Sequence, residues 1–482
     1  MWNWIKGFFS AQPIGSHFYQ EMRRNALKEL AANRPQHAML HLASLLNYSE
    51  PPAVELDDPA VWRDAMRLFA KAANAMNILL TDAEPAESVA GGSKRPVRKL
   101  STLLKDLGDN PHDAELLVAL SSVMVEYEAA GIGAMFLARA ARIMPSEYRI
   151  RDFLALTLMN QRNYVAAANA LRGASAYLEN HRPGRYILTR ALLWQGDSRE
   201  ASAQWRFALP PTNAYEQQQY DQVEGFRQRV DAYERQRQLD GKDLRGWHFV
   251  LTGGILLHLS PVGSEVMNGR YAMLFDDVGR TLECIQRLAA LLKACNKTVP
   301  QVFALPDHES QILAAATARY LGCPLQSWRE EGTDEAGLIV AYSLNQIDPE
   351  LGATLAHHRP GQIFWAHTCS WLADVPVAPD LVSLLVERNL SPWAGRPGNF
   401  EGIAPQRTGT ITALADEILN AHLEDEALRD LPDLCQWVSA LPTLPELHTA
   451  GIFRNEGQRR VFYADSPVSS NSFRGVGGQL SS

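Results

Sequence analysis

Residues 114–147 read AELLVALSSVMVEYEAAGIGAMFLARAARIMPSE, and two further windows of 34 residues, starting at 148 and 182, repeat their pattern. Positions 8, 20 and 27 carry small side chains in all three windows. These nine residues are Ser121, Ala155, Thr189, Gly133, Ala167, Ala201, Ala140, Ala174 and Ala208. Because packed helices approach closely only where their side chains are small, the spacing predicts three stacked helical hairpins.

Larger apolar side chains stand in register between the small ones. Positions 7 and 24 of the three windows hold Leu120, Leu154, Leu188, Leu137, Leu171 and Trp205. Pro145 ends the first window and Gly196 marks the turn between the helices of the third, since both residue types favour the end of a helix. An irregular helical bundle in which alanine recurs by accident is the alternative explanation.

The period resembles that of the tetratricopeptide repeat (TPR) family, a helix–turn–helix unit of the same length. The resemblance covers residues 114–213, where Tyr164 and Ala167 match the aromatic and small residues next to the family's turn. The chain departs from the family at position 4, where the usual Trp is replaced by Leu117, Arg151 and Arg185. The resemblance implies an α-solenoid whose first helices line a groove.

The same resemblance implies which side chains face that groove. The partner-binding candidates are Arg149, Asp152, Asn160, Tyr186, Arg190 and Trp194. A mixed polar and aromatic lining suits a peptide or helix with both charged and apolar anchors. We therefore expect a protein or peptide partner in the groove.

Helical spacing of apolar residues extends beyond the repeats. It predicts helices over 17–48, 59–82 and 97–107, and a capping helix over 214–239. The predicted domain order is an N-terminal helical region (1–83), a flexible linker (84–96), TPR-like helical repeats with the capping helix (97–240), an α/β domain (241–375), a mostly helical C-terminal extension (376–465) and a disordered tail (466–482).

After Gly241 the pattern changes to short apolar runs that alternate with helical segments. The predicted strands are 248–259, 271–275, 301–305, 337–342 and 362–367, and the predicted helices between them are 279–295, 308–321 and 348–358. Such βαβ units close into a parallel sheet with helices on both faces. We predict a TPR-like α-solenoid followed by a Rossmann-like parallel α/β sheet domain, with 380–440 mostly helical.

Polar residues follow the predicted strands at their carboxyl ends, where parallel sheets bind ligands. The ligand-binding candidates are Asp276, Asp277, Thr281, Asp307, His308, Ser343 and His367. Each also has a structural explanation, because Asp307 and Ser343 are good helix N-caps and the Asp276–Asp277 pair could begin a loop. The sequence leaves both interpretations open.

Residues 272–281, AMLFDDVGRT, resemble the phosphoribosyltransferase signature, in which a strand runs into paired acids and a phosphate-binding loop. The resemblance implies that Asp276 and Asp277 hold ribose hydroxyls and that Thr281 holds a phosphate. Much of the family's loop is missing, since Val278-Gly-Arg contains one glycine and no Thr-Gly pair.

Composition excludes several classes of function. Residues 1–240 carry 28 Lys and Arg against 27 Asp and Glu, and residues 241–482 carry 18 against 27, so neither half has the excess of cations that nucleic acid requires.

The five cysteines form no close pair, which suits reduced thiols and a cytoplasmic location. No apolar run of 18 residues predicts a membrane span. No Walker A, GxGxxG, GxSxG or HExxH motif is present, so no metal or cofactor is predicted.

Two functions from different classes fit these observations. The first is a cytoplasmic protein–protein interaction adaptor, whose repeats bind one partner and whose α/β module binds a second partner or ligand. The alternative is a transferase for a phosphoribosyl or nucleotide substrate, recruited by the repeats, with Mg²⁺ beside the acidic pair. We favour the adaptor because no catalytic motif is complete.

Overall fold

The computed structural model describes residues 16–43, 59–75, 100–126, 129–172, 178–260, 267–329, 332–372, 375, 377–394, 397–398, 402–403, 409–424, 426–442, 449–450, 453–454, 457–459, 462 and 465–468. The chain divides into two compact units. The first is Met1–Ala191 with Phe207–Leu209 and Phe473–Ser482, and the second is Leu192–Arg206 with Pro210–Ser472. The predicted linker at 84–96 and the tail from 469 onward lie outside the described residues.

The first unit begins with helices that share one apolar core with the repeats. They are α2 (Ser16–Ala31), α3 (Pro35–Ala43), α4 (Pro59–Ala75) and α5 (Leu100–Asp109). Trp62 of α4 is buried and donates its indole N–H to the carbonyl of Leu107 at 2.6 Å. The Phe69 ring packs edge-on against Phe136 of the repeats, with centroids 5.5 Å apart.

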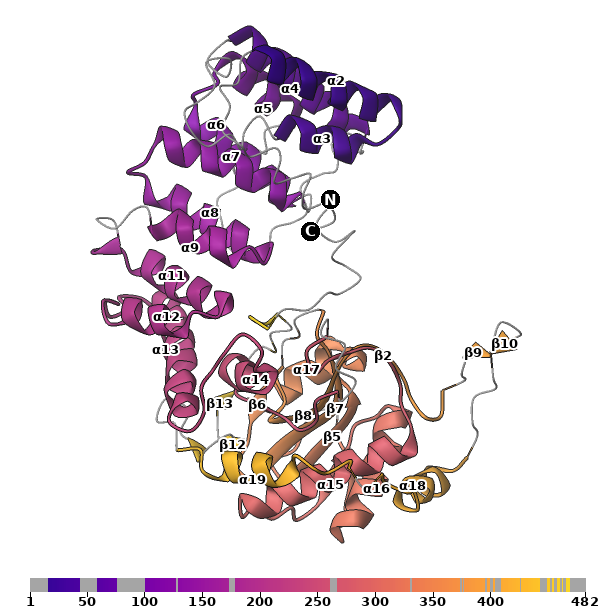
Figure 1. The fold of residues 1–482 in the computed structure, drawn as a ribbon. Coiled ribbons are helices and arrows are strands. Elements are labelled where there is room, and N and C mark those ends of the chain that lie inside the picture. Colours follow the sequence, from indigo (N-terminus) through magenta and orange to yellow (C-terminus); the bar gives the residue numbers. More distant parts are fainter. Residues whose placement is uncertain are drawn as a thin grey trace. The chain divides into compact units, whose positions relative to one another are not determined.

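The helices of the repeat region keep the 34-residue period. The first helices of the hairpins begin at 114, 148 and 182, and the second helices at 130, 164 and 198. They are α6 (Ala114–Glu126), α7 (Ala130–Ile143), α8 (Tyr148–Asn160), α9 (Tyr164–Arg172), α11 (Arg182–Gln195) and α12 (Ser198–Trp205), shown in Figure 1. The prediction of helical hairpins at this spacing is confirmed.

The small residues lie where the helices touch. Ser121 on α6 donates its hydroxyl to the carbonyl of Gly133 on α7 at 2.8 Å. A Cβ on Gly133 would lie 3.1 Å from the Ser121 carbonyl and hydroxyl oxygens, so a larger residue would push these helices apart. Ala167 and Ala201, at the same position of the next windows, are also buried.

In the second unit, α13 (Ala214–Glu234) follows the last hairpin and begins at Asn213, whose side chain accepts from the Glu216 N–H. Its Phe226 ring lies 4.9 Å from the ring of Trp194. The predicted helix over 214–239 therefore covers residues of the last repeat.

The second unit also holds a seven-stranded sheet in which all pairs are parallel. Its strands are β1 (Ile255–Leu256), β2 (Tyr271–Phe275), β3 (Val302–Ala304), β4 (Leu325–Ser327), β5 (Gly337–Ser343), β7 (Gln362–Ser370) and β8 (Leu381–Leu390). They follow the order β1-β8-β7-β5-β3-β4, and β2 also pairs with β8. The parallel α/β sheet is confirmed, but β1 and β2 occupy an edge, whereas the Rossmann order has its first strand inside the sheet.

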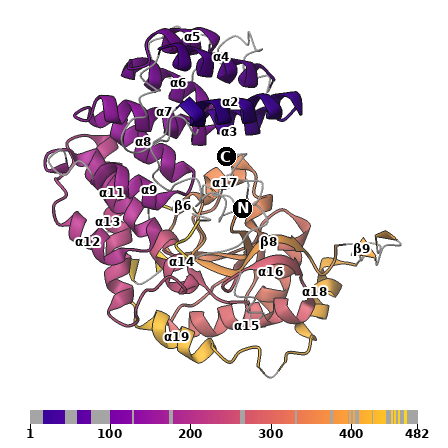
Figure 2. The same cartoon turned by 45° about the horizontal axis from the view of Figure 1, so that its top comes forward.

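Helices lie on both sides of this sheet, as parallel strands require. Figure 1 and Figure 2 show α15 (Val278–Ala294), α16 (His308–Leu321), α18 (Ile411–Leu419) and α19 (Leu431–Ser439) together on one side. On the other side lie α14 (Leu244–Thr252) and α17 (Pro349–Leu355). Short antiparallel pairs join β6 (His357–His358) to β13 (Gly457–Gln458), β9 (Pro397–Gly398) to β10 (Gly402–Ile403), and β11 (Thr449–Ala450) to β12 (Phe453–Arg454).

The predicted strand over 248–259 is wrong in its first half. Residues Leu244–Thr252 form α14, which Asp243 caps by accepting from the Gly246 N–H at 2.8 Å. The helix ends at Gly253, whose φ of 78° is left-handed. All nine residues of the helix are buried, so its apolar run has no helical periodicity that could distinguish it from a strand.

The expectation that 380–440 is mostly helical is wrong at β8, which is paired on both edges. Leu381 pairs with both Ile255 and Trp365. The first six residues of β8 are buried, so polar and apolar residues do not alternate along it. The frayed tail does not begin at 466 either, because Val468 is buried and its carbonyl accepts from Arg270 Nη2 at 3.1 Å.

Candidate functional site

Three side chains meet beside the carboxyl end of β2, one from the residue that follows this strand and two from β5 and β7. Asp276 Oδ2 accepts from the hydroxyl of Tyr342 on β5 and pairs with Nε2 of His367 on β7, both at 2.8 Å. Its Oδ1 accepts from the backbone N–H of Asp277 at 3.0 Å. Asp276 and His367 are fully buried side chains. The strand-end cluster, as we call Asp276, Tyr342 and His367, therefore ties β2 to β5 and β7.

Charge holds this cluster together. Burial lowers the pKa of His367, but the Asp276 carboxylate, together with Cys284, outweighs burial and raises the pKa to about 10. Burial raises the pKa of Asp276, but the charge and hydrogen bond of His367 bring it below its usual value. Burial and the neighbouring carboxylate raise the pKa of the Tyr342 phenol. Each partner thus favours the charged form of the other across this buried contact.

The acids that were predicted beside Asp276 serve as helix caps. Asp277 caps α15, with Oδ1 accepting from the Arg280 N–H at 2.8 Å. Thr281 is buried and donates its hydroxyl to the Asp277 carbonyl at 2.9 Å. Asp307 caps α16 by accepting from the Ser310 N–H at 2.8 Å.

The two remaining candidates are not members of the strand-end cluster, although Ser343 directly follows Tyr342 in β5. Ser343 is buried and accepts from the Asn345 N–H at 3.3 Å, at the start of η2 (Leu344–Gln346). His308 is exposed as the first residue of α16. The structure thus brings together Asp276 and His367 and adds Tyr342, which sequence reasoning missed because it lies inside a buried strand rather than after it.

A second polar cluster was not predicted from the sequence. His258 bonds through Nε2 to the hydroxyl of Tyr271 at 2.7 Å and through Nδ1 to Glu283 Oε1 at 2.9 Å. The order hydroxyl, imidazole, carboxylate is that of an activated nucleophile with its base and orienting acid. The only signal in the sequence was a histidine within an apolar run that was predicted to be a strand.

The surroundings of this cluster oppose activation of the tyrosine. Burial raises the pKa of Tyr271, so its phenol holds its proton more tightly. Glu283 Oε1 also accepts from Arg287 Nε at 2.7 Å, and Arg287 pairs in turn with Asp430 at 2.8 Å. The Glu283 carboxylate therefore forms an ion pair with Arg287 as well as bonding to His258. The network links α15 to Asp430, the residue before α19.

The partner-binding candidates on the hairpins differ in accessibility. Arg149 and Asn160 are exposed on α8, and Arg190 is half-buried. Asp152 Oδ2 bonds to His181 Nε2 at 2.6 Å. Tyr186 is buried and donates its hydroxyl to the Leu209 carbonyl at 2.6 Å.

Trp194 is also buried, against Phe226. Neither aromatic candidate is therefore placed as a surface anchor, since α13 and the residues after α12 use them for packing. The exposed apolar residues of α8 are instead Tyr148 and Leu156, which are 48% and 38% exposed.

The described part of the chain contains neither a membrane-spanning helix nor a group of metal ligands. None of its helices is long and apolar enough to cross a membrane. Among the same residues, no three His, Cys, Asp or Glu side chains are grouped so that they could hold a metal ion.

No protein-family model matches the sequence, and no curated protein does. Among solved structures, one mutant of MamA is 15% identical, with a TM-score of 0.21 over 39% of this chain and 94% of its own. MamA MSR-1 is 14% identical, with a TM-score of 0.21 over 39% and 93%. A mutant of Thermobaculum terrenum O-GlcNAc transferase is 13% identical, with a TM-score of 0.19 over 65% and 54%. TM-scores this low do not establish a shared overall fold.

Proposed function

We propose that the chain is a cytoplasmic protein-interaction adaptor whose helical hairpins act as TPR repeats and bind a protein or peptide partner. The observation that carries this proposal is the 34-residue spacing of both sets of helix starts. A stack of equal hairpins presents equivalent helix faces side by side, which suits an extended peptide or a helix.

The face of α8 is the best candidate for the contact. Arg149, Leu156 and Asn160 are exposed and are separated by seven and four residues, so they lie on one side of the helix. Tyr148 adds an exposed ring at the same end as Arg149. Its ring centroid is 5.4 Å from that of His181, which limits the freedom of the side chain. We define this α8 face by these four residues: Tyr148, Arg149, Leu156 and Asn160.

The side chains of the α8 face indicate which class of partner could bind there. Arg149 offers a cation, and Leu156 offers an apolar contact about two helical turns away. A peptide with an acidic residue and an apolar anchor at a matching distance would satisfy both. The partner expected here is therefore an acidic, amphipathic segment of another protein.

The test is a peptide-display selection on the full chain, followed by affinity measurements with variants of the α8 face. Arg149→Glu and Leu156→Asp should each weaken the selected peptides at least about tenfold, because each removes an anchor. Arg172→Glu and Val165→Asp change an exposed arginine and an exposed apolar residue of α9 and serve as matched controls. Binding by the α8 face would be contradicted if the α8 and α9 variants lost peptide affinity equally, or if no variant lost it.

The transferase alternative requires carboxylates that a ligand can reach. Asp276 is buried and its oxygens already accept from Tyr342, His367 and a backbone N–H. Asp277 is partly exposed but caps α15 and lies 3.3 Å from Arg280 Nη1. These contacts support a structural role for the acidic pair, and the proposal therefore stays with the adaptor.

A further inference from the structure

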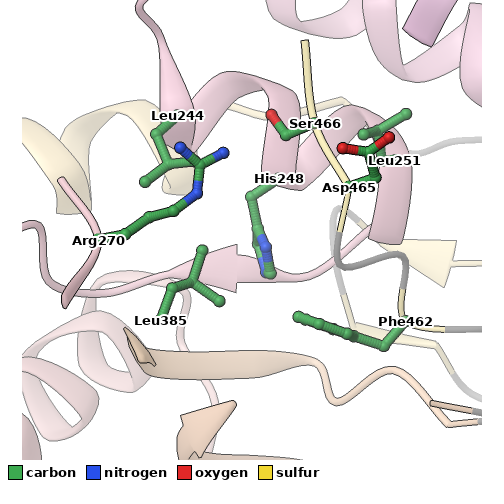
Figure 3. Close-up of a pocket in the computed structure, with 8 residues that line it drawn as sticks. All are labelled: Leu244, His248, Leu251, Arg270, Leu385, Phe462, Asp465 and Ser466. Carbon is green, nitrogen blue, oxygen red and sulfur yellow. The ribbon is translucent and has the colours of Figure 1, made fainter. Parts of the chain in front are cut away.

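A pocket lies on the α14 side of the sheet in the second unit, with an empty volume of about 260 Å³ that includes its open mouth. Figure 3 shows residues from α14, β8, the approach to β2 and the C-terminal segment around it. The lining consists of Leu244, His248, Leu251, Arg270, Leu385, Phe462, Asp465 and Ser466. Four of these are apolar, and the polar ones include a buried arginine and a buried histidine.

Arg270 is a buried cation with spare hydrogen-bond donors. It is 3% exposed, and its Nη2 donates to the Val468 carbonyl at 3.1 Å. Within the described residues, Nε and Nη1 have no hydrogen-bond partner, and Asp465 is the acid whose charge acts on the guanidinium. Its other neighbour is the Trp371 ring, whose centroid is 5.5 Å from the guanidinium carbon. Burying a cation without a counter-ion is costly, so this arrangement needs an explanation.

His248 is the second buried polar group of the pocket. It is 5% exposed, and its Nε2 has no hydrogen-bond partner in the described part of the chain. Burial, together with the charge of Arg270, lowers the pKa of His248 to about 3, so the imidazole is neutral at physiological pH. A neutral imidazole can donate or accept one hydrogen bond without adding charge.

Asp465 is the acidic residue of the lining. Burial lowers the pKa of Arg270 to about 10, and the Asp465 carboxylate partly offsets that effect. The carboxylate therefore acts on the guanidinium across the pocket rather than through an ion pair in contact with it. An anion that entered the pocket would come closer to Arg270 than Asp465 does and would be repelled by Asp465.

We propose that this pocket binds the carboxylate or phosphoryl group of a small anionic ligand, through the two unpartnered N–H groups of Arg270 and with His248 as an additional hydrogen-bond partner. A guanidinium suits both groups, because its charged N–H donors form strong hydrogen bonds with carboxylate and phosphoryl oxygens. The leucines of the lining contact the apolar part of the ligand. All lining residues belong to the second unit and the α8 face belongs to the first, so the two proposed sites are distinct.

The dimensions of the pocket limit how the ligand enters. The enclosed interior holds about one water molecule. Only the terminal oxygens of the ligand therefore reach Arg270, and the rest of the ligand lies in the open mouth of the pocket.

The test uses the full chain at constant ionic strength, with acetate, phosphate and chloride titrated separately. Melting temperature and isothermal titration calorimetry report binding. We expect a saturable rise in melting temperature with acetate or phosphate that chloride does not reproduce. Saturation with acetate alone identifies a carboxylate ligand, and saturation with phosphate alone identifies a phosphoryl ligand. If neither anion saturates, the proposal is overturned.

Two variants and one control locate the binding at this pocket. Asp465→Asn removes the competing negative charge and should lower the dissociation constant of the anion at least about threefold. Asp433 is an exposed acid of α19, so Asp433→Asn should leave this constant unchanged. Arg270→Met should abolish the saturable rise without lowering the melting temperature of the unliganded protein, since an unpaired buried cation does not stabilise the fold.

If Arg270→Met fails to fold, the arginine is required for folding. The comparison of Asp465→Asn with Asp433→Asn then decides by itself whether the anion binds in this pocket. Equal anion affinity in those two variants would overturn the assignment to this pocket. Retained anion binding in a folded Arg270→Met variant would overturn it as well. Neither result bears on peptide binding by the α8 face.

Discussion

At the scale of single residues, the strand-end cluster shows how one carboxylate acquires a structural role. Asp276 lies at the end of β2, yet its side chain bonds to Tyr342 and His367 on two other strands. A buried ion pair is costly to desolvate and is sustained only when further hydrogen bonds satisfy its oxygens. Asp276 meets that condition, which explains why a residue at a typical ligand-binding position is used to hold the sheet together.

The pKa of His367 makes a pH-dependent prediction. Its folded-state pKa of about 10 is higher than its ordinary value of 6.5, so its contribution to stability is complete below pH 6.5 and is lost as pH rises through 10. Asp276 has a lowered pKa, and its contribution is lost as pH falls below 3.8. His367→Gln should therefore cost about 3 to 5 kcal/mol near pH 6, and the difference from the parent should shrink toward pH 10.

Urea denaturation at several pH values measures this difference. His308→Gln, at an exposed histidine, should be nearly neutral at every pH and serves as the control. A cost of His367→Gln that stays constant between pH 6 and 10 would show that the pair is not ionised in the folded protein.

At the scale of elements, the hairpins depend on small residues at one repeated position. Position 20 holds Gly133, Ala167 and Ala201, and each lies in a close helix contact or is buried. The larger residues of the hairpins are tolerated because they point into the spaces between helices rather than at the points of contact.

A larger side chain at position 20 should destabilise the repeats. Ala167→Leu and Ala201→Leu should each lower the free energy of unfolding by about 1 to 3 kcal/mol, because the added atoms have no space at the helix contact. Val165→Leu, at an exposed position of α9, should change it by less than about 0.5 kcal/mol. Chemical denaturation measures the stability of all three variants. If Ala167→Leu and Ala201→Leu were as stable as the parent, the repeat register would be contradicted.

At the scale of the whole molecule, the sheet needs a strand that comes late in the chain. β8 pairs with β1 and β2 on one edge and with β7 on the other. The predicted α/β domain of 241–375 excludes this strand, so that boundary is wrong. Without β8, the first two strands of the sheet would have no partner.

Truncation tests this dependence. A fragment of 192–375 lacks β8 and should fail to unfold cooperatively, whereas a fragment of 192–472 contains all of the sheet and should show a single thermal transition. Circular dichroism melting curves distinguish the two. A cooperative transition in the shorter fragment would mean that the sheet is stable without its late strand.

Local patterns in the sequence determined the hairpins and most of the sheet. The small residues at period 34 predicted where helices begin, because helix packing within a repeat depends on near neighbours in the chain. Strands β2, β3, β5 and β7 and helix α16 were also predicted, since each is a short periodic or apolar run between turn signals.

Tertiary structure alone decided the identity of segments that are buried on all sides. α14 and β8 are apolar runs without periodicity, so their conformation depends on the partners that cover them. The same holds for the polar clusters: Tyr342 and His258 come from apolar stretches, and only the folded sheet brings them to Asp276 and Glu283. The unpartnered donors of Arg270 have the same origin, because burial and pairing are properties of contacts between segments far apart in the chain.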